Sequence, residues 1–484
     1  MSTMNASATA QRPSVAKPAA KAPRRRTGHG ATVLVAALAS AFGTGILAVI
    51  DLVATTVAAD PIWGQEQSVR MVLTIVSTVF IAIAVYVAAI VTVNTVATIV
   101  AGRTRELALA RLLGATAASR RALLAREGLV AGTIGGIIGM LAALGLVWGG
   151  TRIAVGTGLL PDLAYAPFSP LALGLMVIIA LTTWLSSWVG ARRVLEVSPI
   201  AALGAAVPAD TEAIRGRRGR RTFAIVMLAV GAALLGLGLV TGLVHPIGLL
   251  ISFTGGIVSF TGVVAGSIFV IPPVLRAVGA LFGRRPAAKI GAANAIRSPE
   301  RSARASIGLV IGATLVTTLF VASATFERML QIKSEAVFGS TEPVDGVLDQ
   351  LMLIFGVLIG YSALIAAVGL VNALTVGVLQ RTREFGLLRA LGFSRGQVRG
   401  TVIAEAATMT ITSLSLGLAL GVGYGWVGAN SLFAGELGHL HPPVVPWWLI
   451  VGVAAIGALL TFAASLVPAG RASRLSPVVA LAAY

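Results

Sequence analysis

One long stretch occurs twice in the sequence, and this internal repeat limits the fold more than any other feature. Residues 93–127 read VNTVATIVAGRTRELALARLLGATAASRRALLARE, and residues 371–405 read VNALTVGVLQRTREFGLLRALGFSRGQVRGTVIAE. Adding 278 to a residue number in the first copy gives its partner in the second, and this register continues to Pro199 and Pro477. About 110 residues therefore match without a net insertion or deletion, which indicates two copies of one structural unit.

The composition places both copies in a membrane. Hydrophobic residues make up 56% of the chain and charged residues 11%, and the mean hydropathy is +0.91. A soluble domain carries about a quarter charged residues, so this chain is suited to lipid. Each repeated charged stretch lies between long apolar runs, which predicts a membrane module with a cytosolic finger. The chain has no cysteine, which excludes disulfides, thiolate metal sites and cysteine nucleophiles.

The net charge of +19 favours a membrane rather than a nucleic acid as the partner, because of how the charge is distributed. Of the 37 Lys and Arg residues, all but four fall in segments that we expect to face the cytosol. By the positive-inside rule this asymmetry places both termini in the cytosol. The four exceptions are Arg70, Arg152, Arg328 and Lys333.

The apolar runs predict an all-α integral membrane protein with ten transmembrane helices arranged as four, two and four. The uncharged run at 71–101 exceeds the roughly 20 residues that cross a bilayer, so we expect it to tilt or project. The pair 222–244 and 247–270, joined by the turn His245-Pro246, has no counterpart in the repeat. We expect this pair to be a connector that is peripheral to any transport path. The other predicted spans are 31–50, 128–149, 171–190, 307–325, 350–379, 404–427 and 446–467.

These spans divide the chain into four parts. We expect a disordered basic cytosolic tail at 1–30, a first four-helix unit at 31–203, cytosolic linkers with the connecting pair at 204–293, and a second four-helix unit at 294–484. Small residues four apart inside the spans predict seams of close helix packing. These glycines are Gly132 and Gly136, Gly135 and Gly139, Gly417 and Gly421, and Gly421 and Gly425.

Each charged finger (103–126 and 381–399) is predicted to be a helix, a glycine break and a second helix that returns to the membrane. Gly114 and Gly392 suit the position just past a helix end, where a left-handed residue is needed. Thr116 and Ser394 suit the first cap of the returning helix, and Ser394 with Gln397 matches the reciprocal capping pattern. The charged face of the first finger carries Arg103, Arg105, Glu106 and Arg111, and that of the second carries Arg381, Arg383, Glu384 and Arg389.

Two interpretations of this charged face stay open. A basic amphipathic helix on anionic lipid would account for the arginines. It would not account for the glutamate that occupies the same place in both copies, Glu106 and Glu384, because an anionic surface would repel it. Docking on a protein is therefore the favoured interpretation.

The finger pattern R-x-R-E-x-x-x-x-R-x-x-G, closed by S-P-x-x-A-L after the fourth span, resembles the FtsX-like permeases of ABC transporters. Residues 294–304, NAIRSPERSAR, also resemble that family's cytosolic lead-in to its first span. The family includes MacB-type exporters, lipoprotein-releasing permeases and bacitracin-type resistance permeases. The resemblance implies four spans per unit in a bacterial plasma membrane, with each finger docking on an ATPase through its glutamate and neighbouring arginines. The short outer loops, 51–70 and 327–349, depart from members that have a large outer domain.

The sequence lacks the residues that would let this chain hydrolyse ATP through a P-loop. That motif needs a lysine directly after a glycine, and none of Lys17, Lys21, Lys289 and Lys333 follows one. We therefore expect a non-enzymatic membrane subunit that binds no cofactor, with ATP and Mg²⁺ used by two copies of a separate ABC ATPase. His439 and His441 could ligate a metal or haem, but further ligands are not evident.

The sequence thus predicts a permease subunit that moves an amphiphilic substrate, with the lipid bilayer and the ATPase as partners and no nucleic acid. The alternative is a signal transmitter in which the same motion regulates an outer enzyme or sensor kinase without transport. Short outer loops would give such a partner little surface. A secondary transporter would need ionisable residues at mid-membrane, whereas Glu127 and Glu405 lie near the cytosolic ends of their spans.

Overall fold

The computed structural model describes residues 29–59, 116–158, 160–165, 170–191, 211–281, 299–339 and 394–474, with Gly114, Ala293 and parts of 71–96. All regular secondary structure in these residues is helical. The chain is a multi-pass membrane protein, because seven of its described helices are long and apolar enough to cross a bilayer. The helices are α1 (His29–Ala59), α4 (Ala117–Gly156), α5 (Leu171–Gly190), α7 (Thr211–Gly242), α8 (Gly248–Ala265), α9 (Ser267–Leu281), α11 (Pro299–Phe338), α14 (Arg395–Leu437) and α15 (Trp447–Arg474).

The predicted ten-span arrangement is supported only in part. Seven predicted spans coincide with α1, α4, α5, α7, α8, α11 and α14. Shorter apolar helices, Thr74–Val87 and Trp447–Leu459, occupy the places of the predicted second and tenth spans. The predicted eighth span, 350–379, lies outside the described residues, so the full count stays a prediction.

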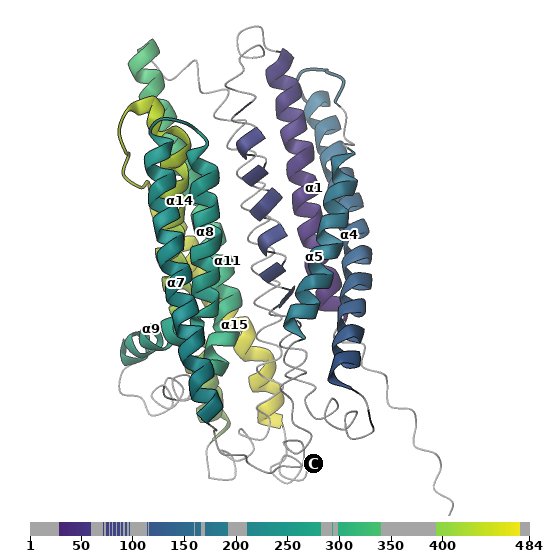
Figure 1. Ribbon diagram of the computed structural model, residues 1–484, viewed down its shortest axis with the longest axis vertical. Coiled ribbons are helices and arrows are strands. Elements are labelled where there is room, and N and C mark those ends of the chain that lie inside the picture. Colours follow the sequence, from purple (N-terminus) through teal and green to yellow (C-terminus); the bar gives the residue numbers. More distant parts are fainter. Residues whose placement is uncertain are drawn as a thin grey trace, which may run out of the picture.

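The described helices repeat in the same way as the sequence. Helix α4 begins at Ala117 and α14 at Arg395, which are equivalent positions in the two copies. In the first copy α4 packs against α1 and α5, and in the second α14 packs against α11 and α15. Figure 1 shows α1, α4 and α5 on one side and α7, α8, α11 and α14 on the other. The segment 71–96 packs between them, since Val87 shares a buried cluster with Val35 of α1 and Val310 of α11.

Glycines on α4 and α14 let the paired helices approach closely, as their spacing predicted. A side chain at Gly139 would overlap the backbone of Ala37 on α1, and one at Gly425 would overlap the backbone of α11 at Thr318. The hydroxyl of Ser40 uses this proximity to donate to the Gly136 carbonyl at 2.8 Å. Close helix contact of this kind replaces the hydrophobic drive that lipid does not supply.

Several helices extend beyond the predicted spans. Helix α1 continues through Asp51 to Ala59, and α11 continues to Phe338, so residues expected in outer loops are helical. The extension of α11 ends at Gly339, which has a left-handed φ of +72°. Helix α4 has 40 residues and is therefore about 60 Å long, about twice the hydrocarbon thickness of a bilayer.

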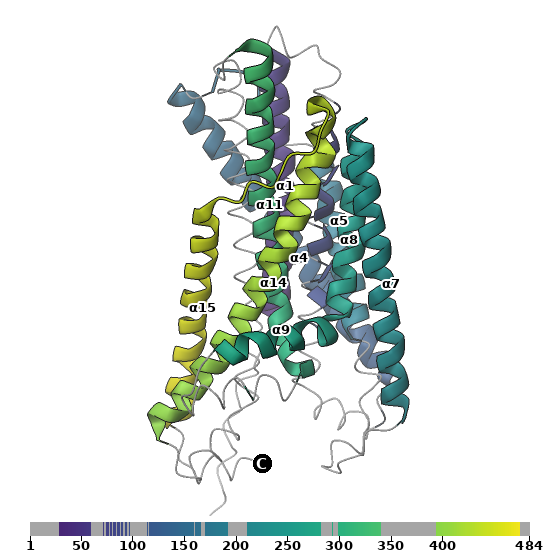
Figure 2. The same cartoon turned by 90° about the vertical axis from the view of Figure 1, so that its left-hand side faces the viewer.

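The inserted hairpin differs from its prediction at one end. Helices α7 and α8 are joined by a tight turn at His245-Pro246, as predicted. Helix α8 ends at Ala265, however, and the next residues form α9, which runs across the bundle axis in Figure 2. The break falls at Gly266, which caps α8, and Pro272 and Pro273 lie inside α9, where neither can donate a backbone hydrogen bond.

Candidate functional site

The described residues include little of the two predicted fingers. Of the ten predicted coupling residues, Gly114 alone is described, and it is exposed with a left-handed φ of +92°. The other nine lie outside the described residues, so their docking role stays a prediction. They are Arg103, Arg105, Glu106, Arg111, Arg381, Arg383, Glu384, Arg389 and Gly392.

The caps that follow the glycines are formed as predicted. The Thr116 hydroxyl accepts a hydrogen bond from the Ser119 amide at 3.1 Å. The Ser394 hydroxyl accepts from the Gln397 amide at 3.2 Å, and the Gln397 side chain accepts from the Ser394 amide at 2.9 Å. Each cap fixes the point at which the chain turns back toward the membrane.

The returning part of each finger and the following span form one helix, which the sequence did not reveal. The predicted finger ended at 126 and the predicted span began at 128, yet α4 runs unbroken from Ala117 to Gly156. Helix α14 likewise runs from Arg395 to Leu437. The finger end and the membrane-spanning part of each helix are therefore one continuous element.

Arg121 joins the start of α4 to the end of α5. Its guanidinium carbon lies 3.4 Å from the centroid of the Trp188 ring, and its Nε donates to the Trp188 carbonyl at 2.9 Å. Stacking of arginine on tryptophan combines a cation–π attraction with a hydrogen bond to the last turn of a helix. The repeat places Arg399 opposite Arg121 but Leu466 opposite Trp188, so this contact belongs to the first unit.

A cavity of about 200 Å³ lies between segment 71–96, α8, α11 and α14. Among the described residues, its lining contains no aspartate, glutamate, lysine, arginine or histidine. The sequence did not predict this cavity, because its lining comes from five separate parts of the chain, including Leu235 of α7. Lining residues include Val79 and Ile83 of segment 71–96, Phe253 and Ile257 of α8, Leu315 and Leu319 of α11, and Val427 and Gly428 of α14.

Two tyrosines at one end of the cavity hold α8 in place. The Tyr86 hydroxyl donates to the Ile257 carbonyl at 3.1 Å and lies 2.8 Å from the Thr261 hydroxyl. The Tyr424 hydroxyl lies 2.8 Å from the Ser259 hydroxyl. Both phenols thus find their polar partners on one stretch of α8, which leaves apolar ring surface toward the cavity.

The inserted hairpin is therefore not peripheral to the packing of the second unit. Helices α7 and α8 both pack against α14, and the hydroxyls of Ser252 on α8 and Ser431 on α14 lie 2.6 Å apart. Gly242 also approaches the backbone of Ser431. The expectation that the pair is peripheral to a transport path stays a prediction. Absence from the repeat does not keep the pair from packing against α14.

A second, polar cavity of about 170 Å³ lies between the ends of α1 and α4 that are remote from the fingers. Asp51, Arg152 and Asp162 line it, together with Tyr165. Burial and then the nearby Asp162 carboxylate raise the pKa of the Tyr165 phenol above its ordinary value. The guanidinium of Arg152 lies 5.8 Å from the ring centroid of Trp148.

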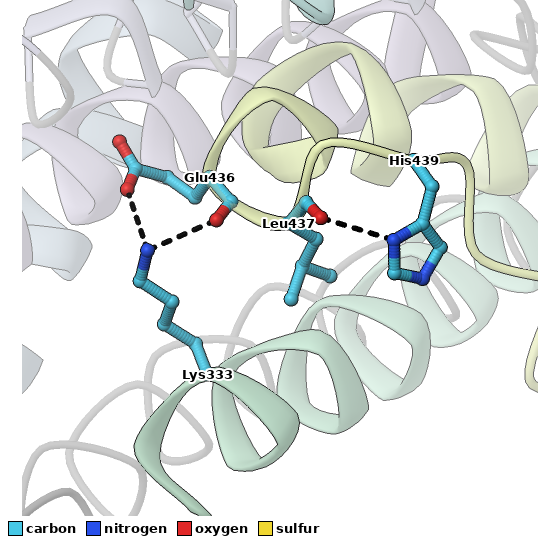
Figure 3. A network of polar contacts seen from close by, with 4 residues as sticks. All are labelled: Lys333, Glu436, Leu437 and His439. Atoms are coloured by element: carbon cyan, nitrogen blue, oxygen red, sulfur yellow. Dashed lines mark hydrogen bonds and ion pairs between the residues drawn. The ribbon is translucent and has the colours of Figure 1, made fainter. Parts of the chain in front are cut away.

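The loop from α14 to α15 is fixed by hydrogen bonds. Asn430 donates to the His441 carbonyl at 3.1 Å and accepts from its amide at 2.8 Å, and the Trp426 indole donates to the same carbonyl at 2.7 Å. Figure 3 shows Lys333 of α11 reaching the end of α14, where its Nζ lies 2.9 Å from the Glu436 carbonyl and 3.4 Å from its carboxylate. The bonds of Asn430 and Trp426 hold the loop against α14, and the contacts of Lys333 hold α11 against the end of α14.

The two loop histidines are not placed as a metal site. The Nδ1 of His439 lies 3.0 Å from the Leu437 carbonyl (Figure 3), and the Nδ1 of His441 lies 2.8 Å from the Pro442 carbonyl. Within the described ranges, no three His, Cys, Asp or Glu side chains come together in a way that could hold a metal ion.

Comparison with known families decides the class of membrane protein. The family model described as FtsX-like permease C-terminal matches twice, at residues 78–199 and 356–477. The chain belongs to the FtsX-like permease family. The two matches are related by the same offset as the sequence repeat, and α4 and α14 lie at equivalent places within them.

Individual relatives match over about a quarter of this chain. An uncharacterized ABC transporter permease, YknZ of Bacillus subtilis, is 31% identical over 130 residues, which are 26% of this chain and 30% of the relative. The macrolide export ATP-binding/permease protein MacB of Sodalis glossinidius is 29% identical over 131 residues, or 26% and 19% of the two chains. MacB of Nitrobacter winogradskyi is 30% identical over 130 residues, or 27% and 19%. The matched part thus spans less than a third of each relative.

Proposed function

We propose that this chain is the permease subunit of an ABC transporter in a bacterial plasma membrane, and that it exports or extracts an amphiphilic substrate. The observation that carries the proposal is the double family match at 78–199 and 356–477. A permease that works with a pair of ATPase subunits needs two docking fingers, and this chain has two copies of the segment that would provide them.

The ATPase is proposed to be a separate polypeptide. The MacB relatives are named as combined ATP-binding and permease proteins. In this chain, by contrast, no lysine follows a glycine as a P-loop requires. Two ATPase copies would therefore bind ATP and Mg²⁺ and dock on the fingers, through Glu106 and Glu384 with the neighbouring arginines.

The proposed orientation puts the fingers in the cytosol. Described residues at the finger end of the helices include a surplus of basic side chains, such as Arg120, Arg126, Arg218, Arg220 and Arg221. Acidic and basic side chains are more evenly mixed at the opposite end, where Asp51, Arg152 and Asp162 lie. This distribution follows the positive-inside rule, and we propose the four-part division at 1–30, 31–203, 204–293 and 294–484 on the same basis.

The coupling path would run along α4 and α14. Each is a single helix that starts behind a finger and crosses the membrane. Helix α14 also forms a wall of the apolar cavity and contacts α7, α8, α11 and α15. ATP-driven closure of the ATPase pair would move the fingers, and α14 would then change the shape of the cavity.

The test is ATP hydrolysis by the purified complex of this chain with its ATPase in lipid nanodiscs. The proposal predicts that hydrolysis depends on the permease and is stimulated by amphiphiles. A stable complex whose hydrolysis responds to no amphiphile, but which alters the activity of a sensor kinase, would instead support the signalling alternative.

A further inference from the structure

The apolar cavity has the shape of a slot rather than a sphere. Along α8 its lining runs from Leu249 to Phe260, and along α11 from Ile311 to Phe326. At 1.5 Å per residue these stretches are about 16 Å and 22 Å long. The hydrocarbon of one bilayer leaflet is about 15 Å thick, half of the total. The slot is thus at least as long as one leaflet is deep, although its volume is only about 200 Å³.

The chemistry of the lining selects an apolar occupant. Residues at helical spacing on α8 and α11 present one face each to the slot, and this face is made mainly of aliphatic and phenylalanine side chains. Most polar groups of the lining bond other residues: Tyr86 and Tyr424 bond α8, and Ser252 bonds Ser431. The buried Thr314 hydroxyl on α11 has no hydrogen-bond partner among the described residues and could meet a single polar group. A charged group in the slot would lose its water without a partner of opposite charge.

The size of the slot restricts that occupant further. An apolar cavity of about 150 Å³ stays dry and binds a molecule as small as benzene, whereas pockets for drug-sized ligands measure roughly 300–1,000 Å³. A volume of about 200 Å³ spread along two leaflet-length walls suits a narrow, extended ligand. A compact macrocycle would not enter it without moving a helix.

We propose that this cavity binds one acyl chain of an amphiphile that enters from the bilayer. The walls belong to membrane-spanning helices, so the lipid bilayer around them contains such acyl chains at high concentration. The inserted helix α8 supplies one wall, and Tyr86 and Tyr424 fix it across from α11. The repeat places Leu364 opposite Tyr86 and Leu146 opposite Tyr424, so the site belongs to one half of the molecule.

Two glycines allow the slot to be filled without disturbing the helices. Gly428 of α14 and Gly256 of α8 both line the cavity, and a Cβ added at either meets no atom within 4 Å. Gly428→Leu and Gly256→Leu should therefore project side chains into the empty space. Matched controls are Gly423→Leu on α14 and Gly236→Leu on α7, where the glycine is exposed and the space is equally open.

The experiment uses the full chain in phosphatidylcholine nanodiscs that contain a trace of palmitic acid with a diazirine on its chain. After illumination, mass spectrometry measures the labelling of cavity-lining positions such as Phe253 and Leu315. We expect Gly428→Leu and Gly256→Leu each to reduce this labelling about tenfold, equivalent to 1.4 kcal/mol of binding free energy. The Gly423→Leu and Gly236→Leu controls should label like the unaltered chain.

Equal labelling of cavity positions in all five proteins would overturn the proposal. Displacement of the label by a macrolide but not by unlabelled palmitic acid would also overturn it, in favour of a macrocycle site. Because binding is measured without the ATPase, its failure would leave the proposed permease function to be judged by ATP hydrolysis.

Discussion

At the scale of single residues, the absence of a side chain determines how closely the helices approach. Gly139 of α4 faces the backbone of α1 at Ala37 and Ala41, and Gly417 occupies the equivalent position of α14 against Ala313. Gly145, six residues further along α4, is exposed and has no neighbour within 4 Å. The loss of stability caused by a larger residue should therefore differ between glycines of the same helix.

This difference gives a prediction for stability. Gly139→Leu should destabilise the protein by about 2 kcal/mol or more, because the new side chain overlaps backbone that cannot move without separating α1 from α4. Gly145→Leu should be neutral or slightly stabilising, since it replaces an exposed helical glycine. Thermal unfolding in detergent measures both, and equal midpoints would contradict the assigned seam.

At the scale of elements, two long helices begin at caps of different strength. Ser394 and Gln397 exchange two hydrogen bonds at the start of α14, whereas Thr116 accepts one from the Ser119 amide at the start of α4. The first turn of α14 should therefore fray less than it would with an unsatisfied terminus.

Removing the stronger cap should loosen that turn. We expect Ser394→Ala to cost about 1 kcal/mol of local stability, which corresponds to about fivefold faster amide exchange at the first residues of α14. Ser394→Asp should preserve slow exchange, because aspartate is an equally good cap. Hydrogen exchange read by mass spectrometry makes the comparison, and unchanged exchange in the alanine variant would contradict it.

The predictability of these elements follows from the range of the interactions involved. The caps and the glycine seams were predicted because each depends on residues within one turn or at fixed helical spacing. The ends of α1 and α11 were misplaced because charged residues such as Asp51 and Glu327 resemble loop residues, although an exposed helix accepts them. The cavity was missed because Tyr86 and Tyr424 are ordinary aromatic residues until tertiary packing brings them to α8.

At the scale of the whole molecule, the repeat predicts how the complex assembles. One chain carries both proposed fingers, so native mass spectrometry should find one permease with two ATPase subunits. An active complex with two copies of this chain and two of the ATPase would contradict the proposal that a single chain forms the membrane portion.

The fingers themselves supply a test of coupling. Glu106→Lys combined with Glu384→Lys should abolish stimulated ATP hydrolysis or complex formation, because both acidic docking groups are reversed. Expression and the unfolding midpoint should stay unchanged, and Arg218→Glu, a single charge reversal of opposite sign outside the fingers, is the control. Normal stimulation by the double variant would refute the docking assignment.

The two fingers also differ in sequence, and we expect them to bind the ATPase with different strength. The first finger has Leu107 and Ala108 where the second has Phe385 and Gly386. We therefore expect the two single reversals, Glu106→Lys and Glu384→Lys, to reduce ATP hydrolysis by different factors. Titration of the ATPase into each variant measures this difference, and identical binding curves would show that the fingers are equivalent.

The contact between Ser252 and Ser431 has a consequence for how the protein is made. A ribosome adds roughly 5–20 residues per second, so α8 is complete roughly ten to thirty seconds before Ser431 leaves the ribosome. For most of that interval α14, which supplies partners for Ser252 and Ser259, does not yet exist. The α7–α8 hairpin must persist in lipid on its own contacts, which its close approach of Gly231 to Ser259 and of Gly238 to Ser252 provides. The nascent hairpin thus serves as a template onto which a helix synthesised much later must dock.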